Sequence, residues 1–292
     1  MSFEMEVRAQ RMIKKGEEIT TRYLGPWEGQ PARQMKIEKN WKFICDCLRC
    51  RDPTDMATYF SAVKCHKCPR KLSADKCIET GSTDITCDDI LPNSGYLLPI
   101  DLQMLGTPWK CNACGHIRSF REIEDILKSL KNIVDQSKSE ILQIMSDQFS
   151  ETVSYVETSV QILEEKLHPN HFIIFQFKEW VIELPKPTSI VQIKQNDSLN
   201  APRDFFSEIS FMELQMRYHL DILKTVEILD RGLTINRAGH HKQLAKCRME
   251  LSGLKMAADP DSYTKVHHMK EMKIAMSELK QVSLSFKYPE IR

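Results

Sequence analysis

The sequence predicts a mixed fold, in which a small cysteine-rich region with short strands and many turns precedes a mainly α-helical array. Two observations support this division. Nine of the ten cysteines fall between residues 45 and 114, and only Cys247 lies outside that range. From residue 118 onward, apolar residues recur at intervals of three and four, the periodicity of amphipathic helices. The 292 residues are enough for about two domains.

The composition excludes some classes of partner. Lys+Arg 41 and Asp+Glu 40 leave a net charge of +1, which gives no electrostatic case for nucleic acid or an anionic membrane as the main partner. No run approaches the roughly 20 apolar residues that a membrane span needs. The start, MSFEMEVRAQRMIKKGEE, lacks the apolar core of a signal peptide. We therefore expect a protein of the cytoplasm, the nucleus or both.

Two cysteine pairs have the spacing of metal ligands. CHKC contributes Cys65 and Cys68, and CNAC contributes Cys111 and Cys114. In a reducing compartment clustered cysteines are more often metal ligands than disulfides. Two such pairs complete a tetrahedral four-sulfur site, so we expect them to hold zinc tightly. An all-sulfur site has no open position, which indicates a structural zinc rather than a catalytic one.

A third motif, CDCLRC, contributes three cysteines: Cys45, Cys47 and Cys50. A zinc ion here needs one more ligand, so we expect a looser or vacant site. The candidates for the fourth ligand remain open: Cys77, Cys87, His66, His116, or a cysteine that this chain lacks. A swapped pairing, in which Cys65 completes this cluster, is also open. Cys77 and Cys87 are more simply interpreted as ordinary buried thiols.

The segment before CDCLRC alternates around a turn. Residues 3–9 and the β-branched, aromatic stretch EITTRYL (18–24) predict two strands, joined by the turn KKGE (14–17), where glycine supplies a positive φ. Without further context, Tyr23 in the second strand is more simply a packing residue than a catalytic one. Residues 31–43, entered through Pro31, predict a helix that brings Phe43 beside the cysteines.

The region after residue 118 predicts consecutive helices with short breaks. The first apolar stripe indicates one long helix or two in series, and it consists of Leu142, Met145, Phe149, Val153, Val156, Val160, Leu163 and Leu167. Pro169 ends this stripe and starts the next element. The second stripe is closed by Gly232 and consists of Ile209, Met212, Met216, Leu220, Leu223 and Val226. We expect these stripes to be mainly core.

Two more helices are predicted further on. Residues 244–254 carry an apolar face, and residues 262–282 mark the last helix, while residues 185–202 break the pattern and predict a loop. The histidine pairs at 240–241 and 267–268 are expected to be exposed residues rather than metal ligands. The sequence contains no clean 34-residue repeat.

Two motifs in a fixed order resemble a known family. AQRMIKKGEEITTRY is followed by R-x3-I-x3-W-x-F-x-C-x-C-x2-C, residues 33–50. Together they resemble the end of a SET domain and its post-SET zinc segment. More narrowly, the chain is similar to the SMYD (SET and MYND) protein lysine methyltransferases. The knuckle W-x-C-x2-C-G and the later LHPNH (167–171) are similar to arthropod-type members.

The resemblance implies four segments along the chain. Residues 1–25 would end a SET domain, residues 26–52 would form the post-SET zinc segment, and residues 53–117 a second zinc-binding region. Residues 118–292 would form a helical, TPR-like C-terminal domain. In the family, such a helical array borders the substrate cleft.

The same resemblance implies roles for individual residues in methyl transfer from S-adenosylmethionine to protein lysine. Tyr23 matches the tyrosine whose hydroxyl lines the lysine channel, where it orients the amine and stabilises the polarised methyl group. Phe43 matches the aromatic residue that packs on the cofactor's adenine, and Trp41 stands where the family usually has tyrosine. The post-SET zinc ligands match Cys45, Cys47 and Cys50.

Part of the family pattern has no counterpart in these 292 residues. The earlier SET strands, the MYND finger and the NHSC-type motif, which supplies cofactor contacts and a fourth zinc cysteine, do not occur. We therefore expect a C-terminal portion of a SMYD-type methyltransferase that is inactive as a free chain. The alternative is a non-catalytic, zinc-stabilised protein-interaction module. In both cases the partner is a protein, and histone and non-histone substrates are equally open.

Overall fold

The computed structural model describes residue 9 and residues 12–68, 95–185, 204–232, 234–259, 261 and 263–286. The chain forms two compact units. Trp27–Gln136 and Thr158–Ile174 make up one of them, named here the sheet unit. The helical unit consists of Met1–Pro26, Ser137–Glu157 and Phe175–Arg292.

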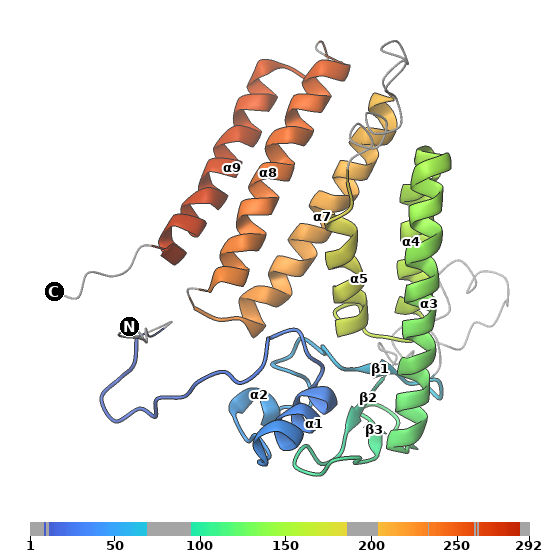
Figure 1. Cartoon of the computed structure of the whole chain (residues 1–292), viewed down its shortest axis with the longest axis vertical. Coiled ribbons are helices and arrows are strands. Elements are labelled where there is room, and N and C mark those ends of the chain that lie inside the picture. Colours follow the sequence, from blue (N-terminus) through green and yellow to red (C-terminus); the bar gives the residue numbers. More distant parts are fainter. Residues whose placement is uncertain are drawn as a thin grey trace, which may run out of the picture. The chain divides into compact units, whose positions relative to one another are not determined.

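The sheet unit is built on a small antiparallel sheet whose strands follow one another in chain order (Figure 1). The strands are β1 (Val63–Lys64), β2 (Tyr96–Pro99), β3 (Trp109–Cys111) and β4 (Ile117–Arg118). In the register, Leu97 lies opposite Val63 on one side and Cys111 on the other. The fully buried side chains around this sheet include Phe60, Leu97, Trp109, Ile123, Leu163 and Leu167.

A segment distant in sequence lies beside β1. Val63 forms an isolated antiparallel bridge with Leu167. The backbone N–H of Lys64 donates to the Lys166 carbonyl at 2.7 Å, and the N–H of His168 donates to the Ala62 carbonyl at 3.1 Å. Residues 166–168 therefore satisfy backbone groups of residues 62–64 that β2 does not reach.

Two helices precede the sheet: α1 (Gln30–Trp41) and α2 (Leu48–Arg51). Pro31 lies in the first turn of α1, and Lys42 ends the helix in a left-handed conformation with a φ of 61°. The predicted helix over 31–43 is therefore confirmed, except that it ends at Trp41 and Phe43 lies beyond it. The buried face of α1 is largely polar, and it consists of Gln30, Arg33, Gln34 and Ile37. Buried polar groups need partners: Gln34 bonds the backbone of Cys45, and Arg33 pairs with Asp55.

The segment after α2 contains a run of left-handed residues. Asp55, Met56 and Ala57 have φ values of 53°, 63° and 62°. The Asp52 side chain holds this run because it accepts hydrogen bonds from the backbone N–H groups of Thr54 and Met56, both at 2.8 Å. Each left-handed non-glycine residue costs roughly 1–2 kcal/mol, so the run stores strain that these bonds offset.

Ala57→Gly is expected to raise the free energy of unfolding by roughly 0.5–1 kcal/mol, because glycine adopts a positive φ without strain. Ala57 is exposed, so no packing is lost. The matched control is Ala257→Gly in the last turn of a helix, which is expected to lower stability by up to about 1 kcal/mol. Urea unfolding measures both changes. A loss of stability in Ala57→Gly would contradict the prediction.

The helical unit confirms most of the predicted helices. The first stripe forms two helices in series, α3 (Phe120–Asp147) and α4 (Thr152–Glu164), separated by the 3-10 turn η2 (Phe149–Glu151). The next helix, α5 (Phe172–Ile182), begins just after Pro169. All three helices contribute residues to both units. Within the first stripe, Leu142 is exposed and Met145 is buried.

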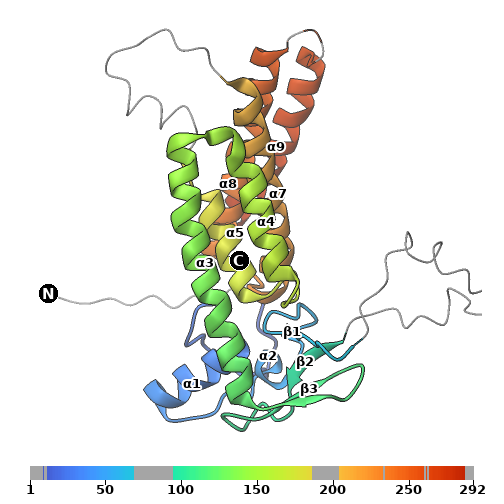
Figure 2. The same ribbon diagram turned by 90° about the vertical axis from the view of Figure 1, so that its right-hand side faces the viewer.

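Three antiparallel helices follow: α7 (Phe205–Leu229), α8 (Ile235–Ala258) and α9 (Lys265–Phe286). Figure 1 shows α8 between α7 and α9, and Figure 2 shows the same helices after a quarter turn. Asp204 and Thr234 cap α7 and α8 by accepting hydrogen bonds from backbone N–H groups. Arg248 on α8 pairs with Glu271 on α9 at 2.8 Å. No helix of the described residues has the length and apolar character needed to cross a membrane.

Two predictions for these segments are wrong. Residues 18–24 form no strand, although the turn before them has Gly16 at a φ of 83°. A strand needs a neighbouring strand, and the described residues provide none for this segment. His241 is buried rather than exposed, because it shares one face of α8 with buried Ala238 and Ala245. Residues 3–8 and the predicted loop beyond residue 185 lie outside the described residues.

His171 is fully buried at the start of α5. Its Nδ1 accepts a hydrogen bond from the Ile173 backbone N–H at 3.2 Å, and its Nε2 has no partner among the described residues. Burial, with a smaller contribution from the charges of His168 and Lys131, lowers the pKa of His171 to about 3. Below pH 6.5 the unfolded chain therefore binds a proton that the folded chain does not bind.

Because of this difference, the free energy of unfolding falls as the pH falls from 6.5 toward 3. Above pH 6.5 the neutral His171 costs the folded chain no stability. From pH 7 to pH 5, His171 alone is expected to remove about 2 kcal/mol. His171→Asn keeps a helix-capping acceptor and removes the titration. Urea unfolding at pH 7 and pH 5 measures the loss of unfolding free energy between the two pH values. This loss should be about 2 kcal/mol smaller in the variant than in the unaltered chain. Equal pH dependence in the two chains would contradict the prediction.

Candidate functional site

The structure brings together the two predicted cysteine pairs. The Sγ atoms of Cys65, Cys68, Cys111 and Cys114 all lie within 4.8 Å of one another, and these residues form the four-thiol cluster. Cys65 Sγ lies 3.7 Å from Cys114 Sγ, and Cys68 Sγ lies 3.6 Å from Cys111 Sγ. Two sulfurs that each bind tetrahedral zinc at about 2.3 Å are about 3.8 Å apart. The spacing fits zinc, and the swapped pairing of Cys65 is wrong.

The antiparallel sheet positions these four sulfurs. Cys65 follows β1, Cys111 ends β3, and Cys114 lies in the turn between β3 and β4. The backbone N–H of Cys65 donates to the Gly95 carbonyl at 2.8 Å. The N–H groups of Ala113 and Cys114 donate to Cys111 Sγ at 3.4 and 3.5 Å. Backbone hydrogen bonds therefore help to fix the positions of these sulfurs.

The thiols of the four-thiol cluster differ in pKa, because their surroundings differ. Burial raises the pKa of Cys68 to about 12. The backbone N–H of His116 lowers the pKa of the exposed Cys114 thiol to about 7. A cation that binds here compensates the burial of thiolate charge, so the cluster favours a metal over free thiolates.

The Sγ atoms of Cys45, Cys47 and Cys50 also lie within 4.8 Å of one another, and these residues form the three-thiol cluster. Cys50 is buried, whereas Cys47 is exposed at the start of α2. The hydrogen bond between their side chains is the main cause that lowers the pKa of Cys47 to about 5 and raises that of Cys50. Burial further raises the pKa of Cys50.

The fourth ligand of the three-thiol cluster is not found among the residues that the structure describes. His66 and His116 are not ligands of the three-thiol cluster, because both lie beside the four-thiol cluster instead. His66 directly follows Cys65, and His116 lies two residues after Cys114. Their rings are 5.0 Å apart, and His66 Nε2 lies 3.3 Å from the Arg118 guanidinium. The remaining candidates in the chain, Cys77 and Cys87, lie outside the described residues. The prediction that they are buried thiols therefore stays a prediction.

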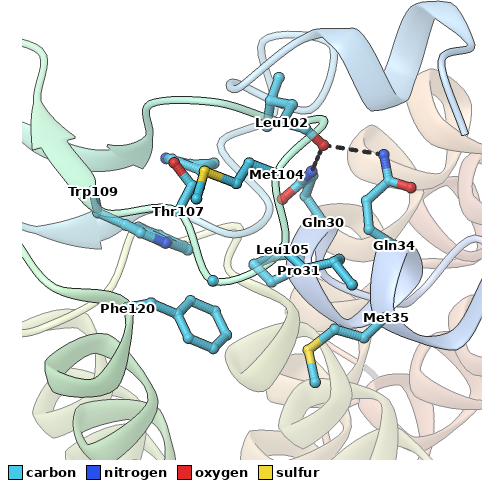
Figure 3. Close-up of a pocket in the computed structure, with 12 residues that line it drawn as sticks. Gln30, Pro31, Gln34, Met35, Leu102, Met104, Leu105, Thr107, Trp109 and Phe120 are labelled. Carbon is cyan, nitrogen blue, oxygen red and sulfur yellow. Dashed lines mark hydrogen bonds between the residues drawn. The ribbon is translucent and has the colours of Figure 1, made fainter. Parts of the chain in front are cut away.

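Helix α1 holds the backbone of the three-thiol cluster. Gln34 Nε2 donates to the Cys45 carbonyl at 2.7 Å, and the Cys45 N–H donates back to Gln34 Oε1 at 3.0 Å. The same amide approaches the Leu102 carbonyl at 3.3 Å (Figure 3). Gln30 and Gln34 both point toward this carbonyl at the edge of a small hollow. Apolar side chains, including Met35 and Phe120, line the rest of the hollow.

A buried ion-pair network lies next to Cys50. Asp55 Oδ1 accepts hydrogen bonds from Arg33 Nη2 at 2.7 Å and from Arg49 Nε at 2.9 Å. Asp55 Oδ2 accepts one from Ser61 Oγ at 2.9 Å. Burial acts to lower the pKa of Arg33, but interactions with Asp55 and then Cys50 outweigh it and raise that pKa. Sequence reasoning missed this network, although the 30–33–37 spacing marks one face of α1.

The predicted channel residues are all partly exposed. Tyr23 belongs to the helical unit with 46% of its surface exposed. Trp41, at the end of α1, and Phe43, two residues later, belong to the sheet unit. Beside Tyr23, the Arg22 side chain pairs with Asp230. The roles of Tyr23, Trp41 and Phe43 stay predictions.

No family model matches the chain. It is similar to the SET domain-containing protein SmydA-8, isoform A, of Drosophila melanogaster, with 32% identity over 111 residues. That match covers 38% of this chain and 19% of the relative. Histone-lysine N-methyltransferase SET5 of Meyerozyma guilliermondii is 48% identical over 48 residues, which cover 16% of this chain and 10% of the relative. SET5 of Candida albicans is 46% identical over 48 residues.

These similarities and the cysteine clusters indicate a protein related to SET-domain methyltransferases. Within that class, the match to SmydA-8 confirms the resemblance to the SMYD type. The chain spans a fifth or less of the length of these relatives.

Proposed function

We propose that the chain forms part of a SMYD-type protein lysine methyltransferase that uses S-adenosylmethionine and holds zinc in both thiol clusters. One observation carries the proposal: three sulfurs converge directly after α1 and Phe43, in the order of a post-SET segment. The similarity to proteins named histone-lysine N-methyltransferase supports it. The substrate would be a protein lysine, of a histone or of another protein, in the cytoplasm or nucleus.

The donor sets of both clusters fit zinc. Thiolates at close to tetrahedral spacing are typical of structural zinc sites, and such zinc contributes folding free energy. In the four-thiol cluster all positions are filled by the chain. In the three-thiol cluster, Cys45, Cys47 and Cys50 would share the ion with a fourth ligand. Each site would hold an irregular segment in place rather than react with substrate.

The aromatic residues would act on the cofactor and the lysine. Phe43 and Trp41 offer apolar faces against which the adenine ring can pack. The Tyr23 hydroxyl would orient the lysine amine toward the methyl group by a hydrogen bond. The helical unit, as a TPR-like array, would present a surface to the protein substrate. Because the NHSC-type motif does not occur in these residues, we expect this chain alone to transfer no methyl groups.

Calorimetric titration with S-adenosylmethionine tests this assignment. We expect measurable binding that Phe43→Ala abolishes, because the adenine loses its aromatic partner. Phe206→Ala is the matched control, since Phe206 is an exposed phenylalanine of the helical unit and binding should be unchanged. An absence of binding by the unaltered, zinc-loaded chain would overturn the cofactor assignment and favour the non-catalytic interaction module. Methyl transfer by this chain alone would contradict the expected inactivity.

A further inference from the structure

The last helix of the array exposes a line of apolar side chains. Figure 1 shows α9 at the end of the array, beyond α8. On this helix Val266, Met269 and Met276 are 75%, 60% and 58% exposed, whereas Ala275 is fully buried. Steps of three and seven residues bring the three exposed side chains onto one face of a helix. This face is therefore a side of α9 that α8 does not cover.

Basic side chains accompany the apolar ones. Lys273 follows Met269 by four residues and precedes Met276 by three, so it lies in the same line, and it is exposed. Its methylene stem adds apolar surface to the line while its ammonium group stays in water. Val266, Met269, Lys273 and Met276 are named here the α9 stripe. Lys270, also exposed, lies beside it.

The acidic residues of α9 are used inside the array. The helix contains two of them, Glu271 and Glu278, and both pair with Arg248 of α8, at 2.8 and 3.2 Å. Their side chains are 29% and 14% exposed. The negative charge of α9 is therefore compensated toward α8, while its lysines lie on the exposed side. The α9 stripe thus combines apolar surface with an excess of positive charge.

We propose that the α9 stripe docks an acidic amphipathic helix of a partner protein. Apolar side chains of that helix would pack against Met269 and Met276, whose flexible side chains adapt to the shape of a partner. Carboxylates of the same helix would pair with Lys273 and Lys270. Lys265 to Met276 rises about 17 Å along the helix axis, so about three turns of the partner would lie along it.

The charge of the α9 stripe argues against other occupants. A second copy that paired through the same face would bring lysines against lysines, and a basic segment of another protein would be repelled in the same way. An anionic membrane would attract the lysines, but helices that lie in a membrane surface typically insert Trp, Phe or Leu, which the stripe lacks. The proposal does not depend on the zinc or cofactor assignments.

Fluorescence anisotropy with a labelled, designed peptide tests the proposal in the full chain. The peptide has leucines at three- and four-residue steps on one face, glutamates beside them, and more than about 15 residues, so that it forms a helix. We expect micromolar binding that weakens as salt is added, because the ion pairs are exposed. A scrambled peptide of equal composition should bind about tenfold more weakly. Equal binding of the two peptides, or no binding of the designed one, would overturn the proposal.

Met276→Glu tests whether the α9 stripe is the surface that binds. Because Met276 is 58% exposed, the substitution removes little packing, and it places a negative charge in the stripe. The affinity for the designed peptide should fall by about tenfold or more. Ile235→Glu is the matched control, since Ile235 is 78% exposed at the start of α8, in the same unit. The control should bind as the unaltered chain does, and unchanged affinity in Met276→Glu would overturn the proposal.

Vesicles that contain phosphatidylserine distinguish a protein partner from a membrane surface. We expect the full chain to remain in the supernatant when such vesicles are sedimented at physiological salt. Sedimentation with the vesicles that Met276→Glu abolishes and Ile235→Glu preserves would assign the α9 stripe to a membrane surface and overturn the proposal. Circular dichroism of both variants should match that of the unaltered chain, because both positions are exposed.

Discussion

Cys68→Ser is expected to release zinc from the four-thiol cluster and unfold the sheet unit. Cys68 is buried, and its sulfur lies 3.6 Å from Cys111 Sγ, so serine removes one of the four proposed ligands that join β1, β3 and the turn after β3. The strands have only two to four residues and cannot hold the unit together alone. Structural zinc contributes roughly 10–16 kcal/mol in isolated zinc fingers, as much as the total stability of most domains.

Zinc content and near-ultraviolet circular dichroism measure this result, and a strong chelator should reproduce it in the unaltered chain. Cys47→Ser is the matched comparison. Cys47 is exposed, and Gln34 still holds the backbone of its cluster, so this variant should lose the weaker zinc and keep the sheet unit folded. If Cys68→Ser retained the tightly held zinc, or if both variants behaved alike, the four-thiol cluster would not be the structural zinc site of the sheet unit.

Gly95→Ala is expected to disrupt the same cluster without removing a ligand. A Cβ atom at position 95 would lie 2.3 Å from Cys111 Sγ and 3.0 Å from Cys68 Sγ. It would also lie 2.7 Å from the Ala113 Cβ. Overpacking of this kind costs roughly 1–3 kcal/mol, and here the displaced sulfurs belong to the proposed zinc ligands. We therefore expect zinc affinity to fall by at least tenfold and the Tm to fall with it.

Gly25→Ala is the control for this substitution, because a Cβ atom there meets nothing within 4 Å. Its stability should change by less than about 0.5 kcal/mol. Chelator competition and thermal unfolding measure both variants. Normal zinc affinity in Gly95→Ala would show that the sulfurs move apart without cost, contrary to the tight packing described here.

The spacing of residues along the sequence predicted the helices and the cysteine pairs correctly, because both depend on residues that are close in sequence. The 3–4 periodicity around Met212 and Leu251 marked helices, because one face of a helix repeats every 3.6 residues. Cys65, Cys68, Cys111 and Cys114 were grouped correctly, because an i, i+3 pair places two sulfurs on one side of a turn.

Contacts between distant segments could not be predicted in this way. Residues 18–24 have the composition of a strand, but a strand is defined by its neighbour, which composition does not reveal. The contact between Gly95 and Cys111 depends on the register of β2 and β3. The buried ion pair of Arg33 depends on Asp55, which lies beyond α1 and also pairs with Arg49.

The backbone bonds between residues 62–64 and residues 166–168 have a consequence for dissecting the protein. They cover the outer edge of the sheet, where an open row of N–H and C=O groups would otherwise invite pairing with another molecule. A fragment that kept every thiol ligand but stopped before residue 166 would expose that edge. Such a fragment would self-associate, so the metal-binding half requires a stretch of chain encoded well beyond its last cysteine.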